Sequence, residues 1–246
     1  MKHLSIDIET RSSVDIGKAG LYKYAQSPDF RILLFAFQED GNPVEVVDLA
    51  QGEEIPEHAV RMLADPDVTK HAYNAAFEWY CLNRAGYQTP LEQWRCTMAH
   101  GLYCGYTAGL DATGKAIGLP QDKQKLAAGK ALIRYFCVPC RPTKTNGNRT
   151  WNQPWHAKEK WELFKEYNRQ DCDRTGDLKP SGAVSDAGGG AEAMADGCPH
   201  ECVRGPCGHG TDRRGPVHRC SQHAGADRGG GPDHRPGKSQ QRGPAG

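Results

Sequence analysis

The composition of the chain changes sharply after Asp171, and this change decides which part of it can fold. From Ser181 to Gly246 the chain contains no Ile, Leu, Phe, Trp or Tyr, while Gly, Pro, Arg, His and Ser dominate. Ordering one residue costs roughly 1–2 kcal/mol of backbone entropy, which a segment without large apolar side chains cannot offset by burial. We therefore expect a folded domain over residues 1–175 and a disordered tail over residues 176–246.

Two acidic side chains lie within the first apolar segment, residues 2–10. Apolar and polar residues alternate there, which is the period of a β-strand. Asp7 and Glu9 therefore point to the same face of the strand. Neighbouring carboxylates repel each other unless a cation lies between them, so the pattern favours a metal site. An exposed edge strand with solvated acids is the alternative.

Two further acidic motifs follow along the chain. The segment Asn74–Glu78 comes after a short apolar stretch, and the segment Tyr167–Asp171 lies near the end of a helical pattern. In that helix Tyr167 and Asp171 are separated by four residues, so both side chains face the same side. For Glu78, a solvated helix acid is the alternative to a functional role.

In this order the motifs Asp-x-Glu, Asn-x-x-Phe-Glu and Tyr-x-x-x-Asp resemble the three exonuclease motifs of the DEDD superfamily. The tyrosine is typical of the tyrosine-type subgroup. The intervening segments 94–98, 117–120 and 130–136 resemble the 3′–5′ exonuclease domain of bacteriophage-type family A DNA polymerases. The resemblance covers residues 1–171 and implies an α/β fold with a ribonuclease-H-like mixed sheet flanked by helices.

The resemblance also implies a hydrolase that removes nucleotides from the 3′ end of single-stranded DNA with two ions, Mg²⁺ or Mn²⁺. Such ions stand about 3.5–4 Å apart and are held by carboxylate oxygens. Asp7 would bridge both ions, and Glu9 and Asp171 would complete the ion that carries the attacking water. Tyr167 would hold that water, and Glu78, where the superfamily more usually has Asp, would serve the second ion.

Three residues near these motifs are implied to contact the substrate, namely Thr10, Asn74 and Phe77. Phe77 can equally be a core residue. The loop Arg141–Gln153 is rich in Lys, Arg, Asn and Thr and is a second candidate for contact with DNA. A solvated loop is the alternative there.

Two other functions remain open at this point. One is a stand-alone exoribonuclease of the same superfamily, because the chemistry at the site would be the same. The other is an inactive nucleic-acid-binding remnant, because a truncated product can lack a stable fold.

The tail has a second interpretation, as a coding sequence translated in a shifted reading frame. When the segment Met194–Gly205 is back-translated and moved by one nucleotide, the genetic code permits Trp-x-x-Asp-x-x-x-Asn-x-x-Gly-Val. This pattern resembles the segment that follows the exonuclease domain in phage-type polymerases. We therefore expect a frameshift shortly after Asp171 that removes the polymerase domain.

Composition indicates the cellular compartment of the protein but does not indicate its binding partners. The net charge is +1, so no global attraction to an acidic or basic partner is implied. The sequence contains no membrane-spanning run and no export signal, so we expect a cytoplasmic protein that does not enter membranes. Its ten cysteines are then expected to be reduced thiols.

Cysteine and histidine in the tail do not indicate a zinc site. Cysteines and histidines are interleaved there, but their spacing is irregular, and no Ile, Leu, Phe, Trp or Tyr is present from Ser181 onward to pack around a metal. The residues are Cys198, His200, Cys202, Cys207, His209, His218, Cys220 and His223. We also expect the isolated Cys137-Val138-Pro139-Cys140 to mark the end of a helix before a loop.

The pattern of apolar residues and turn signals gives a coarse set of elements. Expected strands cover residues 4–8, 31–37, 44–48 and 68–73, and expected helices cover residues 56–64, 75–84, 97–103, 110–117, 126–136 and 158–171.

Overall fold

The computed structural model describes residues 2–106, 109–119 and 129–178. The strands are β1 (Lys2–Arg11), β2 (Arg31–Glu39), β3 (Glu45–Val47), β4 (Val68–Ala72) and β5 (Trp94–Cys96). The helices are α1 (Ile16–Ala25), α2 (Glu57–Ala64), α3 (Ala76–Arg84), α4 (Thr97–Tyr103), α5 (Leu110–Ala116), α6 (Gly129–Phe136) and α7 (Lys158–Asp177). Short 3₁₀ turns are η1 (Leu49–Gln51), η2 (Leu91–Gln93), η4 (Lys144–Asn146) and η5 (Pro154–His156).

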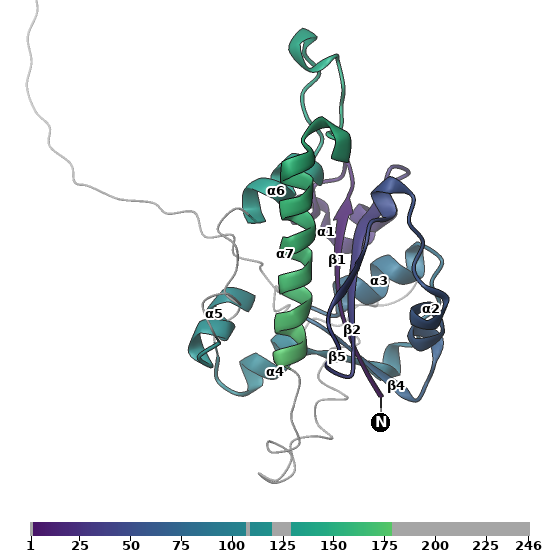
Figure 1. Cartoon of the computed structure of the whole chain (residues 1–246), viewed down its shortest axis with the longest axis vertical. Helices are drawn as coiled ribbons and strands as arrows, with labels where there is room; N and C mark the ends of the chain where they lie inside the picture. Colours follow the sequence, from purple (N-terminus) through teal and green to yellow (C-terminus); the bar gives the residue numbers. More distant parts are fainter. Residues whose placement is uncertain (1, 107–108, 120–128, 179–246) are drawn as a thin grey trace, which may run out of the picture. The chain divides into compact units, whose positions relative to one another are not determined.

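The five strands form one mixed sheet in the order β3-β2-β1-β4-β5. The pairs β1–β2 and β2–β3 are antiparallel, whereas β1–β4 and β4–β5 are parallel. Helices cover both faces of this sheet (Figure 1). The predicted α/β fold, a mixed sheet flanked by helices, is confirmed.

The turn between β2 and β3 shows why the chain reverses there. Asp40 and Gly41 both have positive φ, 46° and 84°. Two consecutive residues with positive φ match the right-handed twist of an antiparallel pair, and Asp-Gly tolerates this conformation well. β2 and β3 therefore form a hairpin.

The alternation in β1 separates an apolar face from a polar one. Leu4, Ile6 and Ile8 belong to a buried cluster that also contains Leu63 of α2 and Leu82 of α3. Ser5, Asp7 and Glu9 therefore face the opposite side of the sheet, because successive side chains of a strand alternate between faces.

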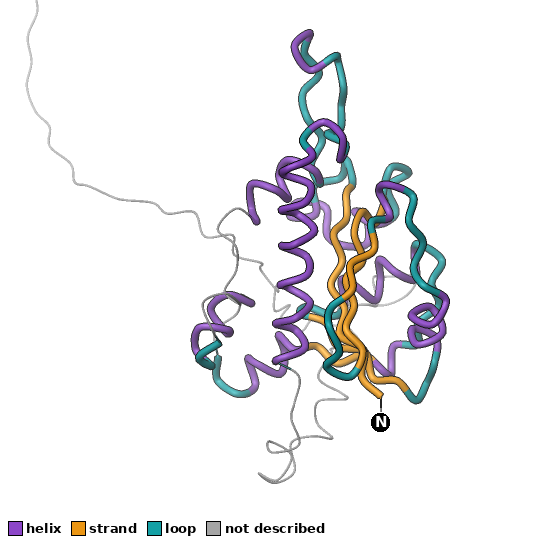
Figure 2. Tube along the Cα trace, in the orientation of Figure 1, coloured by secondary structure: helices purple, strands orange, loops and turns teal. Residues whose placement is uncertain are grey.

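Helix α7 covers that opposite side and packs against β1 and β2 (Figure 2). Its aromatic side chains Trp161, Phe164 and Tyr167 form a second buried cluster with Leu34 of β2 and Phe136 of α6. Helix α7 thus covers the face of the sheet that carries the acids, and its aromatic side chains are buried against that face.

Most of the expected elements are present, with different lengths. β1 extends to Arg11 and α7 to Asp177, while α1 and β5 were not expected from the sequence. The start of the helix expected over 126–136, and the tail with its cysteines and histidines, lie outside the described residues. In the described ranges no helix combines the length and the apolarity needed to cross a membrane.

The cysteines of the described ranges are free thiols, as expected. Cys137 directly follows α6 and is buried, and the Cys140 thiol donates to the carbonyl oxygen of Arg149. The Cys137–Cys140 segment therefore ends a helix before a loop, as predicted.

Candidate active site

The site lies where β1 and β4 separate. The two strands pair from Lys2 and Val68 up to Ser5 and His71. Beyond this point β1 continues to Arg11, whereas β4 ends at Ala72 and the chain turns towards α3. Strand order also changes direction between β1 and β4, since β2 and β3 lie on one side and β4 and β5 on the other. A crevice at such a switch point, at the carboxyl ends of strands, is the usual ligand site of an open α/β sheet.

A β-bulge shapes the far end of β1. Glu9 is opposite Leu34 of β2, but Thr10 is opposite Ile32, so Leu33 has no direct partner. Bulges bend a strand and redirect its side chains, and they are frequent beside active sites. Here the bulge lies at the second acid of the first motif.

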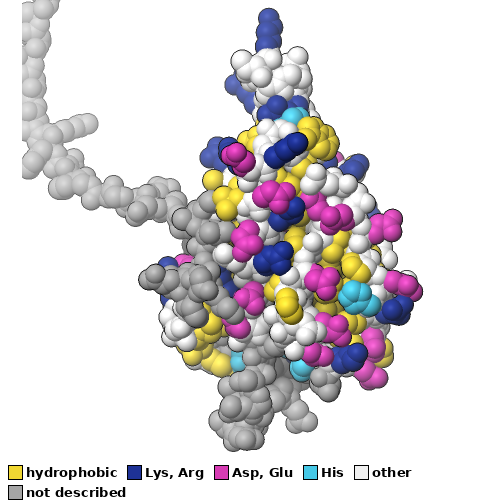
Figure 3. Space-filling view, in the orientation of Figure 1, with side chains coloured by type: hydrophobic (Ala, Val, Ile, Leu, Met, Phe, Trp, Pro, Cys, Tyr) yellow, Lys and Arg dark blue, Asp and Glu magenta, His cyan; other side chains and the backbone are white. Residues whose placement is uncertain are grey.

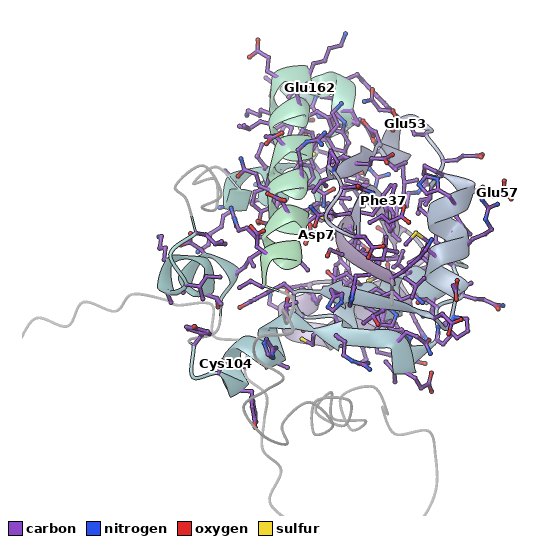
Figure 4. All side chains as sticks on the ribbon, turned by 60° about the horizontal axis from the view of Figure 1, so that its bottom comes forward. Asp7, Phe37, Glu53, Glu57, Cys104 and Glu162 are labelled. Carbon is purple, nitrogen blue, oxygen red and sulfur yellow. The ribbon has the colours of Figure 1, made fainter. Side chains whose placement is uncertain are left out.

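Asp7 is held by α7. The side-chain amide of Asn168 donates to Oδ2 of Asp7 at 2.6 Å and to the backbone carbonyl of Asp7 at 3.2 Å. Figure 4 shows Asp7 beside α7, in agreement with these bonds. Asn168 is fully buried, so its side chain fixes the carboxylate of Asp7 against the helix.

The third motif is also held within α7. Arg174 Nη1 donates to Oδ1 of Asp171 at 2.8 Å, and both side chains are buried. The i, i+4 spacing predicted that Tyr167 and Asp171 face the same side, and the hydroxyl of Tyr167 donates to the carboxylate of Asp171. Burial and the carboxylates of Asp171 and Glu9 raise the pKa of Tyr167 above its ordinary value, so the phenol remains a hydrogen-bond donor.

Tyr167 is at the same time a packed residue. Its ring is stacked on Phe164, with centroids 6.3 Å apart and an interplanar angle of 11°. It also lies against Gly129 of α6, where an added Cβ would come within 2.2 Å of the ring. The glycine is therefore needed to admit the ring, and core packing and a role at the site coexist.

Glu78 approaches the same place from the first turn of α3. It is 3% exposed, and its Oε2 is buried without a hydrogen-bond partner among the described residues. Burial, together with the carboxylates of Asp7 and Glu9, raises the pKa of Glu78 well above its ordinary value. The solvated helix acid considered above is thus wrong, because the side chain is buried and electrostatically coupled to the first motif.

The structure therefore gathers all five residues expected to be catalytic. Asp7, Glu9 and Asp171 all act on the pKa of Tyr167, and two of them act on Glu78. As the side chains stand, the described ranges contain no group of three His, Cys, Asp or Glu residues at metal-ligand spacing. Asp7 and Asp171 are engaged by Asn168 and Arg174 instead.

A pocket of about 440 Å³ adjoins the acids. It is lined by Glu9 and Thr10 of β1, Tyr24 of α1, Phe77 of α3 and several other residues, which are Ile8, Ser12, Ser13, Val14, Asp15, Ile16, Ile133, Cys137, Val138 and Pro139. Most of its surface is apolar. Two of the three residues expected to contact substrate, Thr10 and Phe77, thus share one concave surface beside the acids.

The third residue, Asn74, has a structural role in the turn between β4 and α3. Its φ is 71°, a left-handed conformation in which asparagine is enriched among residues other than glycine. Its carbonyl accepts from the amide of Phe77 at 2.8 Å and so closes the turn between β4 and α3. This turn delivers Glu78 to the site.

Sequence reasoning missed three residues of the site. Asn168 and Arg174 contact the acids from α7, and the Tyr24 hydroxyl is 2.7 Å from the Thr10 hydroxyl in the pocket wall. A signal existed for Arg174, because it follows Asp171 by three residues on the same helix face. Asn168 and Tyr24 carried no such pattern.

One known protein with a clear sequence similarity is a DNA polymerase. Over 174 residues, 70% of this chain, the sequence is 52% identical to the DNA polymerase of Bacillus phage SP02. The chain spans only 26% of the length of that polymerase. No protein-family model matches the chain.

Solved structures are similar only at a distance. An apo form of a nuclease has a TM-score of 0.47 at 19% identity and covers 72% of this chain and 69% of its own. Brucella melitensis NrnC has a TM-score of 0.45 at 18% identity, covering 81% and 78%. The family B DNA polymerase of the hyperthermophilic archaeon Pyrobaculum calidifontis has a TM-score of 0.42 at 17% identity, covering 72% and 24%. The sequence identity is the firmer result: the chain is a homologue of a segment of a bacteriophage DNA polymerase.

Proposed function

We propose that this protein is a metal-dependent 3′–5′ exonuclease acting on single-stranded DNA, and that it corresponds to the proofreading domain of a phage-type DNA polymerase. The buried Oε2 of Glu78 carries the proposal. A carboxylate oxygen without a partner, beside two further carboxylates, is costly to bury unless a proton or a cation neutralises it, and a cation shared by the three carboxylates neutralises all of them together. The similarity to a phage polymerase supports the same reading.

The donor set suits Mg²⁺ or Mn²⁺. All four candidate ligands, Asp7, Glu9, Glu78 and Asp171, offer carboxylate oxygens, which these ions prefer over softer donors. When bound, two such ions would neutralise charge at the scissile phosphate and supply an activated water.

The residues of the chain have separate tasks in this account. Asn168 orients Asp7, and Arg174 orients Asp171, before any ion binds. The Tyr167 hydroxyl stays protonated and can hold the attacking water in line with the phosphate. The apolar pocket with Thr10 and Phe77 receives the terminal nucleoside, and its burial there excludes bulk water from the bond that is cut.

Digestion of a 5′-labelled oligonucleotide tests this function. With Mg²⁺ present, the labelled strand should shorten one nucleotide at a time from its 3′ end, and chelation of the ion should stop the reaction. A parallel RNA strand should be cut more slowly than DNA. Faster cutting of RNA would identify an exoribonuclease, and binding without any cutting would identify an inactive remnant.

A further inference from the structure

A basic arm, residues 138–157, projects from the wall of the pocket. It links α6 to α7 and extends beyond the start of α7, with η4 in its outer part (Figure 1). Cys137, Val138 and Pro139, where the arm begins, line the pocket together with Glu9 and Thr10. The arm therefore starts at the place proposed for the terminal nucleoside.

Charge distinguishes this arm from the rest of the chain. Residues 138–157 contain three basic residues, Arg141, Lys144 and Arg149, and no Asp or Glu, although the whole chain has a net charge of only +1. Arg141 and Lys144 are exposed, and neither forms an ion pair in the part of the chain that the structure describes. Figure 3 shows Lys and Arg side chains at the tip of the arm.

Internal hydrogen bonds give the arm a defined shape. The amide of Cys140 donates to the carbonyl of Thr150 at 2.8 Å, which joins its two legs. Thr143 caps η4, where its hydroxyl accepts from the amide of Asn146 at 3.2 Å. These bonds give the loop an ordered backbone, and this backbone carries the basic side chains.

The base of the arm is fastened to the strand that carries the acids. The guanidinium of Arg11, at the end of β1, lies over the Trp151 ring at 5.0 Å and donates to Gln153 at 3.2 Å. Arg11 is separated from Thr10 of the pocket by one peptide bond. The arm is therefore held in a fixed relation to the pocket and to Glu9.

We propose that the arm is a binding surface for the backbone of single-stranded DNA, contacting the phosphates that precede the terminal nucleotide. Arg141 and Lys144 would neutralise two phosphates, and Trp155, which is 60% exposed on η5, offers a face on which a base can stack. A basic track combined with exposed aromatic rings is the usual equipment for sequence-neutral binding of single strands. This inference rests on the proposed function, since it takes the pocket as the place of the 3′ end.

The test compares two doubly substituted proteins that lose the same charge. One is Arg141→Gln with Lys144→Gln in the arm, and its control is Arg61→Gln with Arg84→Gln on α2 and α3, where both arginines are exposed. The probe is a 5′-fluorescein oligothymidylate whose last linkages are phosphorothioate, so that it resists cutting. Its fluorescence anisotropy is followed at increasing salt concentration.

The slope of log affinity against log salt should become shallower by about 1.4 in the arm variant, about 0.7 for each lost phosphate contact, and should not change in the control. A second measurement uses the p-nitrophenyl ester of thymidine 5′-monophosphate, which carries none of the phosphates that precede the terminal nucleotide. Its kcat/KM should be equal in all three proteins, while KM for the cleavable oligonucleotide should rise only in the arm variant.

These outcomes separate the arm from the proposed function. If the unaltered protein cuts neither substrate, the exonuclease proposal is wrong, and the salt slope still decides whether the arm binds DNA. If the arm variant keeps the slope of the unaltered protein, or if that protein does not bind the probe, the arm does not contact DNA and its charge serves another partner.

Discussion

Arg174 and Asp171 form an ion pair of 2.8 Å within α7, and the two side chains are 1% and 7% exposed. The pair lies beside a tyrosine whose pKa is also affected by Glu9 and Asp7. A guanidinium in this position supplies positive charge to a group of buried acids. It also fixes which way Asp171 points.

Replacing Arg174 should therefore destabilise the fold. Breaking a buried pair by removing one partner leaves an unpaired charge and costs about 3–5 kcal/mol. Arg174→Met should lose this much free energy of unfolding in urea without added ions, and Arg61→Met on the exposed face of α2 should lose about 1 kcal/mol or less. Arg174→Lys should fall between them, because lysine keeps the charge but not the planar fork. A loss in Arg174→Met no larger than in the exposed control would show that the pair is not needed.

Asp7→Asn should abolish ion-dependent cutting while the fold survives. The asparagine can still accept the hydrogen bond from Asn168, and the repulsion between Asp7, Glu9 and Glu78 is reduced. The midpoint of thermal unfolding without ions should accordingly be equal to or higher than that of the unaltered protein. Near-normal cutting by this variant would remove Asp7 from the metal site.

Tyr167→Phe should slow cutting without preventing it. A positioned proton donor or acceptor contributes roughly 10²–10⁴-fold, and the ring itself would still stack on Phe164. Loss of the hydrogen bond to Asp171 should cost roughly 0.5–3 kcal/mol of stability. The single-turnover rate is the quantity to compare, with Asp171→Ala as the more damaging change. An unchanged rate in Tyr167→Phe would make Tyr167 a core residue only.

The first motif could be predicted from sequence because the two-residue alternation that marks the strand also places Asp7 and Glu9 on one face. Leu4, Ile6 and Ile8 enter one core, so the intervening acids must face α7. Likewise the four-residue spacing of Tyr167 and Asp171 on a helix predicted that the two side chains share one face, where they form a hydrogen bond. These parts of the fold and site depend on local geometry alone.

Other parts of the fold and site depend on long-range contacts that no local sequence pattern predicts. Asn168 bonds to Asp7 across 161 residues of sequence, and an asparagine within a helix has no periodic signal. β5 has only three residues, and α1 contains Gly20 at a φ of 81°, which interrupts its helical pattern. β5 forms because it pairs with β4, and α1 forms because its end packs into the core with Tyr24 and Ala25.

A buried lysine gives the fold a distinct pH dependence. Lys70 is fully buried in β4 and donates to the carbonyl of Asp65 at 2.5 Å, and burial lowers its pKa from 10.5 to about 8. Between these two values the unfolded chain binds more protons than the folded one, so the free energy of unfolding should rise with pH across this window. Below it, the charged lysine is buried at a cost on the order of 3 kcal/mol.

Lys70→Met tests this assignment. Its free energy of unfolding should exceed that of the unaltered protein at neutral pH and should lose the rise at alkaline pH, because no buried amine remains to titrate. The carbonyl of Asp65 still accepts from the amide of Val68. Lys18→Met, at an exposed site, should follow the unaltered curve. If the free energy of unfolding of Lys70→Met rises with pH as in the unaltered protein, another titrating group causes the rise.

Glu78 offers the most direct test of the metal-dependent site, through the rate of 3′ shortening measured over a range of Mg²⁺ concentrations. Glu78→Gln keeps the shape of the buried side chain but removes its charge, and Glu162→Gln does the same at an exposed position of α7. We predict that the unaltered protein and Glu162→Gln share one saturable dependence on Mg²⁺, and that Glu78→Gln is slower and needs much more of the ion. A Glu78→Gln curve equal to that of the unaltered protein, or shortening that persists when the ion is chelated, would contradict the account.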